Sequence, residues 1–256
     1  MKNFPTNLLP SWEGRVILSG LRGSHLFGTN IEGSDKDYFA VWSHPPSFYY
    51  GLRALTDSPR RLREEQHQAQ TDGQDLLTID LPKFVQHLTH NNPTYHTFLW
   101  GDDLKATPAG DVLIANREKM VGTPLVRAFW ETGSNLFIHK ELVRSLTMLW
   151  SATELRATGK LVPNKILFAG SIRYAKQYEQ YHGVEAICNR LFDKHNPTIR
   201  DITKPGPTYQ DYEQMLQLAM AHEWNLTLNG VQIESFNGPT QRHRGDQVTD
   251  PDSPGL

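Results

Sequence analysis

The sequence has few cysteines, no long apolar run and no marked excess of either charge. Its single cysteine, Cys188, excludes an internal disulfide framework and a cysteine cluster for zinc. The longest apolar runs, such as residues 39–42 (FAVW), are far too short to span a bilayer, and the first fifteen residues lack the apolar core of a signal peptide. A formal net charge of −2 argues against a bulk nucleic-acid binder. We therefore expect a cytoplasmic protein that makes no membrane contact.

The first hundred residues predict a mixed arrangement of strands and helices. Short β-branched and aliphatic runs predict strands at residues 15–19, 36–42 and 75–80. Pro82 and Pro93 suit the first turns of two helices. The polar stretch 56–74 predicts an exposed connection.

Beyond Gly101 the pattern becomes helical. Apolar spacing predicts helices at residues 107–120, 125–150, 164–181 and 209–228, with breaks near Gly159 and over 196–207. The last segment is rich in glycine, proline and charge, which predicts a disordered tail. The expected fold class is α+β. An N-terminal α/β domain with a small mixed sheet would occupy residues 1–104, a helical domain 105–236 and the tail 237–256.

Asp35 and Asp37 are the first candidate site residues. Side chains at positions i and i+2 of a strand point to the same face, so these two carboxylates would lie together. Such a pair repels unless a cation lies between its members. Carboxylate oxygens suit Mg²⁺, which proteins usually hold with a few carboxylates and substrate phosphates.

Gly23 and Ser24 precede this pair and supply a complementary feature. Glycine allows the backbone to approach a phosphate closely, and amides at the start of a short helix favour an anion. A phosphate loop beside metal-binding aspartates predicts a nucleoside triphosphate site and transfer of a nucleotidyl group. Either motif alone is common by chance, but their order and spacing together are specific.

The run "GSHLFGTNIEGSDKDYFAV" resembles the signature of the DNA polymerase β-type nucleotidyltransferase superfamily, and in particular its bacterial and phage branch of predicted nucleotidyltransferases. The run "LPKFVQHLTHNNPTYHTFLWG" resembles the two helices that follow the third strand in that branch. The resemblance implies that Gly23, Ser24, Ser34 and Lys36 bind the nucleotide. It also implies a third acidic residue, which would complete a site for two Mg²⁺ or Mn²⁺ ions.

Asp75 and Asp80 both compete for the role of that third carboxylate. They lie at opposite parities of one strand, so only one of them can share a face with the metal site. Alignment to the family on Lys83 favours Asp75, which would complete the catalytic and metal-binding set and take the proton of the acceptor. Asp80 suits a helix cap better.

The segment "NKILFAGSIRYAKQY" resembles a family helix that carries a lysine, a histidine and an arginine. Lys165 and Arg173 match two of these positions, but Gly170 stands where the histidine is expected. We expect these two cations to face the acceptor.

The predicted reaction moves a nucleoside monophosphate from a nucleoside triphosphate to a hydroxyl and releases pyrophosphate. RNA, a protein side chain and a small molecule remain open as acceptors, and the oligomeric state also remains open. One alternative is a non-catalytic nucleotide-binding or interaction protein on the same fold. Another is a toxin that uses the same chemistry on a partner or on tRNA.

Overall fold

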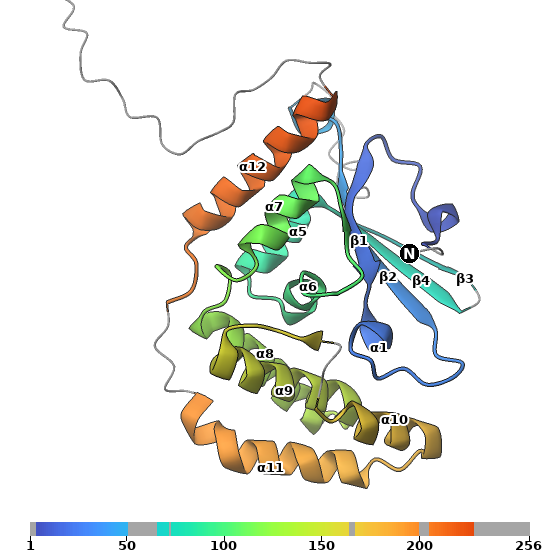
Figure 1. The fold of residues 1–256 in the computed structure, drawn as a ribbon, viewed down its shortest axis with the longest axis vertical. Helices are drawn as coiled ribbons and strands as arrows, with labels where there is room; N and C mark the ends of the chain where they lie inside the picture. The colour runs from blue at the N-terminus through green and yellow to red at the C-terminus, as the bar shows by residue number, and fades with distance from the viewer. Residues whose placement is uncertain (1–3, 51–65, 72, 164–166, 200–204, 228–256) are drawn as a thin grey trace, which may run out of the picture.

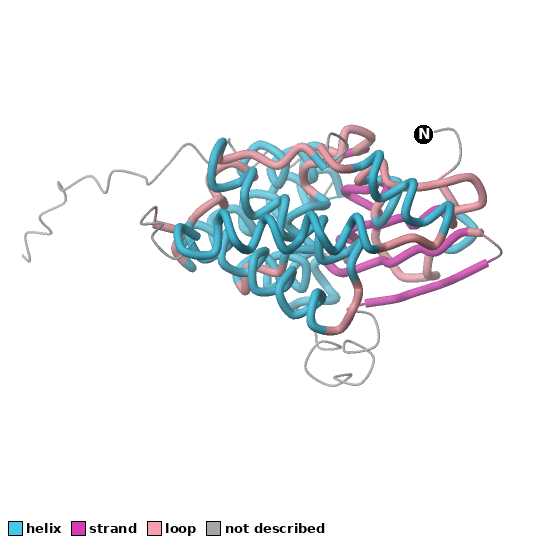
Figure 2. Tube along the Cα trace, turned by 90° about the horizontal axis from the view of Figure 1, so that it is seen from below, coloured by secondary structure: helices cyan, strands magenta, loops and turns pink. Residues whose placement is uncertain are grey.

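The computed structural model describes residues 4–50, 66–71, 73–163, 167–199 and 205–227, and the predicted tail 237–256 lies outside them. A five-stranded sheet forms near the N-terminus and helices make up most of the rest (Figure 1), so the predicted α+β class is confirmed. Strands gather at one end of the molecule and most helices at the other (Figure 2). Within the described residues, no helix is both long and apolar enough to cross a bilayer.

The strands follow the order β3-β4-β2-β1-β5 across the sheet. Their bounds are β1 Arg15–Leu21, β2 Lys36–Ser43, β3 Gln66–Thr71, β4 Gln74–Asp80 and β5 Lys105–Ala106. β2 runs parallel to β4, and the other neighbouring pairs are antiparallel, so the sheet is mixed as predicted. In the parallel pair, Asp37 lies opposite Asp75.

The first helices alternate with the strands along the chain, and those from α7 to α12 follow the last strand. Their bounds are α1 Gly23–Leu26, α2 Pro46–Tyr50, α5 Leu81–Thr89, α6 Pro93–Phe98, α7 Pro108–Asn116, α8 Thr123–Ile138, α9 Leu142–Thr158, α10 Ala169–Tyr178, α11 His182–Ile199 and α12 Tyr209–Thr227. A short 3₁₀ helix, Thr6–Leu8, precedes β1.

The two faces of the sheet are covered differently. Phe39 and Val41 of β2 belong to the large core beneath the helices, whereas Tyr38 and Ala40 belong to a smaller cluster that the N-terminal segment covers. This alternation is that of a strand with both faces buried. Asp37 has the parity of Phe39, so its side chain lies on the face that the helices cover.

The large core continues from the sheet into the helices. It includes Phe84 of α5, Leu113 of α7, Leu149 of α9 and Met215 of α12. α12 packs against α5 and α7, and its Glu223 accepts hydrogen bonds from Arg15 of β1, one of them from Nη2 at 2.9 Å. The last helix described is therefore attached to the first strand. A domain boundary at residue 104 stays a prediction.

The structure corrects three expectations about secondary structure. Part of the polar stretch 56–74 forms β3, an edge strand held mainly by its ladder with β4. The single helix predicted at 125–150 is two helices, α8 and α9, because Lys140 adopts a left-handed conformation with φ 63°. The third correction is α11, which was not predicted. Its buried residues Val184, Ile187, Cys188 and Leu191 do have helical spacing.

His96 of α6 is a buried side chain whose titration matters for stability. Its Nε2 lies 3.0 Å from the Leu88 carbonyl oxygen, and burial lowers its pKa from 6.5 to about 4. The unfolded chain therefore binds more protons than the folded one between these pH values, and stability is lost as the pH falls through this window.

We predict that His96→Gln makes stability less dependent on pH between pH 6.5 and about pH 4, because glutamine does not titrate. Denaturant unfolding of both proteins at several pH values measures this. Parallel pH profiles for the two proteins would contradict the assignment.

Candidate active site

The site begins where β1 ends. Arg22 is the N-cap of α1, and Gly23 follows with φ +61°. A Cβ atom at Gly23 would lie 2.2 Å from Oδ2 of Asp37. Glycine is therefore required twice, for its left-handed backbone and for the close approach of the carboxylate. The predicted phosphate loop and the predicted metal ligand are in direct contact.

The parallel pairing of β2 with β4 brings the carboxylates together. Asp37 and Asp75 are directly opposed, and their parity places both on the helix-covered face. Asp35 precedes β2 by one residue, is exposed, and has its Oδ1 3.9 Å from the position of a Cβ at Gly73. The three aspartates selected from the sequence thus lie at one edge of the sheet.

Electrostatics at Asp37 reflect this crowding. Burial raises the pKa of the Asp37 carboxyl, the positive charge of Arg22 opposes that shift, and the charges of Asp75 and Asp35 add to it. A cation bound beside Asp37 would therefore stabilise its ionised form.

Asp75 already has partners in the structure. Nη2 of Arg22 donates to its Oδ2 at 2.6 Å, and Nε2 of Gln68 lies 3.1 Å from Oδ2 and 3.3 Å from Oδ1. Over the described part of the chain, no three histidine, cysteine, aspartate or glutamate side chains form a ready-made metal site. Neither Arg22 nor Gln68 was selected from the sequence, since neither carries a motif of its own.

Ser34 and Lys36 occupy supporting positions. The Ser34 hydroxyl accepts a hydrogen bond from the Ile31 amide at 3.0 Å, and its carbonyl lies 3.4 Å from Nε2 of His25. The Lys36 amide donates to the Gly73 carbonyl at 2.8 Å, and Lys36 is exposed. Their contacts hold the turn before β2. Their direct binding of nucleotide stays a prediction.

Helix α10 lies against the end of α1 (Figure 1). Arg173 donates to the Gly28 carbonyl at 2.8 Å, and Lys176 donates to the Thr29 carbonyl at 3.0 Å. Burial lowers the pKa of Lys176, and the negative charge of Asp37 opposes that shift. Lys176 follows Arg173 by three residues, a helical spacing that could have revealed it in the sequence. Lys165 lies outside the described residues.

Asp80 lies at the other end of β4. Five residues separate it from Asp75, which is roughly 16 Å along a strand. It occupies the N-cap position of α5, but among the described residues its carboxylate makes no capping bond and instead accepts a hydrogen bond from the Tyr49 hydroxyl. Asp80 therefore has the predicted N-cap position, but within the described part of the chain its side chain does not make a capping bond. A local N-cap signal does not reveal a partner 31 residues away.

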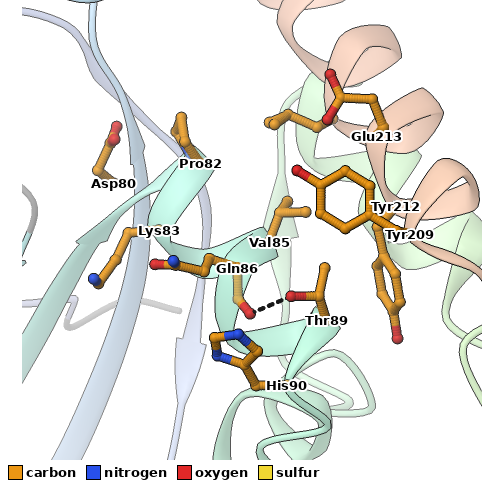
Figure 3. A pocket seen from close by; sticks show the side chains of 11 residues that line it. Asp80, Pro82, Lys83, Val85, Gln86, Thr89, His90, Tyr209, Tyr212 and Glu213 are labelled. Atoms are coloured by element: carbon orange, nitrogen blue, oxygen red, sulfur yellow. Dashed lines mark hydrogen bonds between the residues drawn. The ribbon is translucent and has the colours of Figure 1, made fainter.

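A cavity of about 390 Å³ opens beside Asp80, between α5 and α12 (Figure 3). Its polar lining includes Lys83, Gln86, His90 and Glu213. Since Asp80 and Asp75 mark opposite ends of β4, this cavity is separate from the three carboxylates.

Comparison with known families bears on the part of the chain that carries these features. Residues 7–102 match the family RlaP, described as the RNA repair pathway DNA polymerase beta family. The resemblance to the DNA polymerase β-type nucleotidyltransferases is confirmed. The matched segment runs through the four strands β1 to β4 and helices α5 and α6. It supports a general nucleotidyltransferase role, and hence a nucleotide substrate. No curated protein matches the chain.

The donor set is chemically suited to Mg²⁺ or Mn²⁺. Asp35 and Asp37 present hard oxygen ligands of the kind these ions prefer. The Asp37 carboxylate lies directly against the backbone of the Gly23 loop, because Gly23 has no side chain. Asp75 is a third oxygen donor, although Arg22 now occupies it.

We predict that Asp37→Asn abolishes Mn²⁺ binding without lowering the melting temperature of the metal-free protein. An acid with a raised pKa in the folded state binds its proton more tightly there than in the unfolded chain. Its ionisation therefore reduces stability as the pH rises through that pKa, and asparagine cannot ionise. Calorimetric titration with Mn²⁺ and thermal unfolding in chelator at neutral pH measure the two effects.

Unchanged Mn²⁺ affinity in Asp37→Asn would contradict the metal site. A melting temperature several degrees lower in chelator would show that Asp37 has a stabilising partner that outweighs its repulsion.

Proposed function

We propose that this chain is a metal-dependent nucleotidyltransferase that moves a nucleoside monophosphate from a nucleoside triphosphate to a hydroxyl. One observation carries the proposal: Asp35, Asp37 and Asp75 share an edge of the sheet at which Gly23 lies directly under Asp37. A protein that only bound nucleotide would not require three carboxylates at the reacting end of the phosphates.

In the proposed reaction, the acceptor oxygen attacks the α-phosphorus and the bond to the bridging oxygen of the β-phosphate breaks. Pyrophosphate leaves with that oxygen, and the acceptor proton passes to Asp75. The backbone amides at Gly23 and Ser24 would hold the β- and γ-phosphates, because amides at the start of a helix favour an anion. Asp35 and Asp37 would hold two Mg²⁺ or Mn²⁺ ions, with Asp75 as a ligand of one. When bound, the ions would supply charge stabilisation for the attacking and leaving oxygens.

We propose RNA as the acceptor. The description of the matched family refers to RNA repair, and an RNA end offers the hydroxyl that the reaction needs. The net charge of −2 disfavours strong non-specific binding, so contact with RNA would be local. Arg173 and Lys176, on one face of α10, are cations beside the candidate site.

The deciding experiment incubates the protein with each α-labelled nucleoside triphosphate, Mg²⁺ or Mn²⁺, and either total RNA or lysate protein. We predict label in RNA and release of pyrophosphate, and loss of both in Asp35→Asn. Label in protein would redirect the proposal toward a modifying toxin. Binding of nucleotide with no transfer to any acceptor would favour the non-catalytic alternative.

We further predict that Asp75→Ala and Asp80→Ala affect different properties. Asp75→Ala should lower the transfer rate by several orders of magnitude, since it removes a metal ligand and the proton acceptor. Asp80→Ala should mainly lower the free energy of unfolding by about 1–3 kcal/mol, because it removes the carboxylate to which the buried Tyr49 hydroxyl donates.

Transfer kinetics and denaturant unfolding of both variants test this pair. Near wild-type transfer in Asp75→Ala, with a large loss in Asp80→Ala, would exchange the two roles.

A further inference from the structure

Arg22 contacts two of the three aspartates of the candidate site, Asp37 and Asp75. Its backbone amide donates to the Asp37 carbonyl at 2.8 Å, and its guanidinium binds Asp75 at 2.6 Å. The side chains of Arg22 and Asp75 are only 23% and 16% exposed. An ion pair this enclosed is screened less than a surface pair.

The guanidinium is not fully satisfied where it lies. Its Nε is buried and has no hydrogen-bond partner among the described residues. Arginine carries five N–H donors in a rigid fork, and a buried donor without a partner costs free energy. The guanidinium therefore donates a short hydrogen bond from Nη2 but has, within the described part of the structure, an unsatisfied donor at Nε, as expected of a contact that can be exchanged.

The same pair also affects how a divalent ion would bind to the carboxylates. A divalent ion bound by Asp37 and Asp75 would lie next to the positive charge of Arg22 and would compete with it for Oδ2 of Asp75. Like charges at this separation repel strongly. Arginine does not lose its charge near neutral pH, so the conflict ends only if the guanidinium moves.

We propose that Arg22 and a divalent cation bind Asp75 in turn. In the metal-free protein, Arg22 neutralises the crowded carboxylates and holds Asp75 in place. Metal binding displaces the guanidinium from Asp75, so Arg22 sets how readily the metal site fills. This inference rests on the proposed function, because it assumes that Asp75 is a metal ligand. Arg22 is a positioning residue in this scheme.

Mn²⁺ affinity without nucleotide tests the exchange directly, by calorimetry or by the electron paramagnetic resonance signal of free Mn²⁺. Arg22→Gln should bind Mn²⁺ about tenfold more tightly than the wild type. Tenfold is a lower limit, because it is the order expected when a unit charge about 6 Å from a divalent ion is removed in water, and this ion pair is more enclosed. Arg22→Lys keeps the charge and should stay near the wild-type affinity.

Two further variants make the result specific. In an Asp75→Asn background, Arg22→Gln should raise the affinity by less than it does in the wild type, because the carboxylate for which Arg22 and the metal compete is gone. Arg173→Gln is the matched control. This arginine also lies beside α1 but binds the Gly28 carbonyl, and its loss should leave Mn²⁺ affinity unchanged.

A measurement on the wild type covers the case in which Arg22→Gln does not fold. Addition of Mg²⁺ should shift the Nε–H resonance of Arg22, assigned by its loss in Arg22→Lys, while that of Arg173 stays in place.

Equal Mn²⁺ affinity in folded Arg22→Gln and wild type would overturn the exchange but leave the proposed function intact. An Arg22 resonance that does not move while Mg²⁺ binds would do the same. Absence of Mn²⁺ binding in every variant, Arg22→Gln included, would instead remove the metal site and the exchange together.

Discussion

The parallel pairing of β2 with β4 is the constraint on which the site depends. It sets Asp37 opposite Asp75, although 38 residues separate them in the chain. Parallel strands require a long connection, and here the connection supplies β3, whose Gln68 also reaches Asp75. A shift of this register by one residue would turn Asp75 to the other face. Both faces of β2 are buried against apolar side chains, which fixes the register strongly.

Given that register, charge balance is the next requirement. The three carboxylates at this edge of the sheet repel each other. Two cations from different parts of the chain lie close enough to offset this repulsion. Arg22 comes from the end of β1, and Lys176 comes from α10. The Lys176 ammonium also donates to the Thr29 carbonyl after α1, and the backbone amide of Arg22 donates to the Asp37 carbonyl of β2. The two residues that offset the aspartates therefore also link the segments on either side of α1 to their neighbours.

Much of the site could be predicted from local sequence. A Gly-Ser turn and an Asp-x-Asp strand were sufficient to select Gly23, Asp35 and Asp37, because these features follow from backbone geometry. Strand parity left one place for Asp75 or Asp80, and the resemblance to the family favoured Asp75. Arg22 could not be selected in this way, since a charged residue before a glycine can point in many directions. β3 was missed because its alternating glutamines carry no apolar pattern, and its pairing with β4 decides its structure.

The helical part was harder to predict where a single residue controls the direction of the chain. Lys140 adopts the left-handed conformation that usually favours glycine or asparagine, so the turn between α8 and α9 has no sequence signal. That turn matters for the site because it allows α9 to pack back on α8 and to carry α11. α10 packs in turn on α11. Arg173 and Lys176 of α10 then donate to carbonyls at the C-terminal end of α1. Gly28 and Thr29 directly follow the C-cap of α1, so both cations fix the segment that leaves this helix. The helical part is thus anchored to the segment that joins α1 to β2, on the far side of α1 from Gly23.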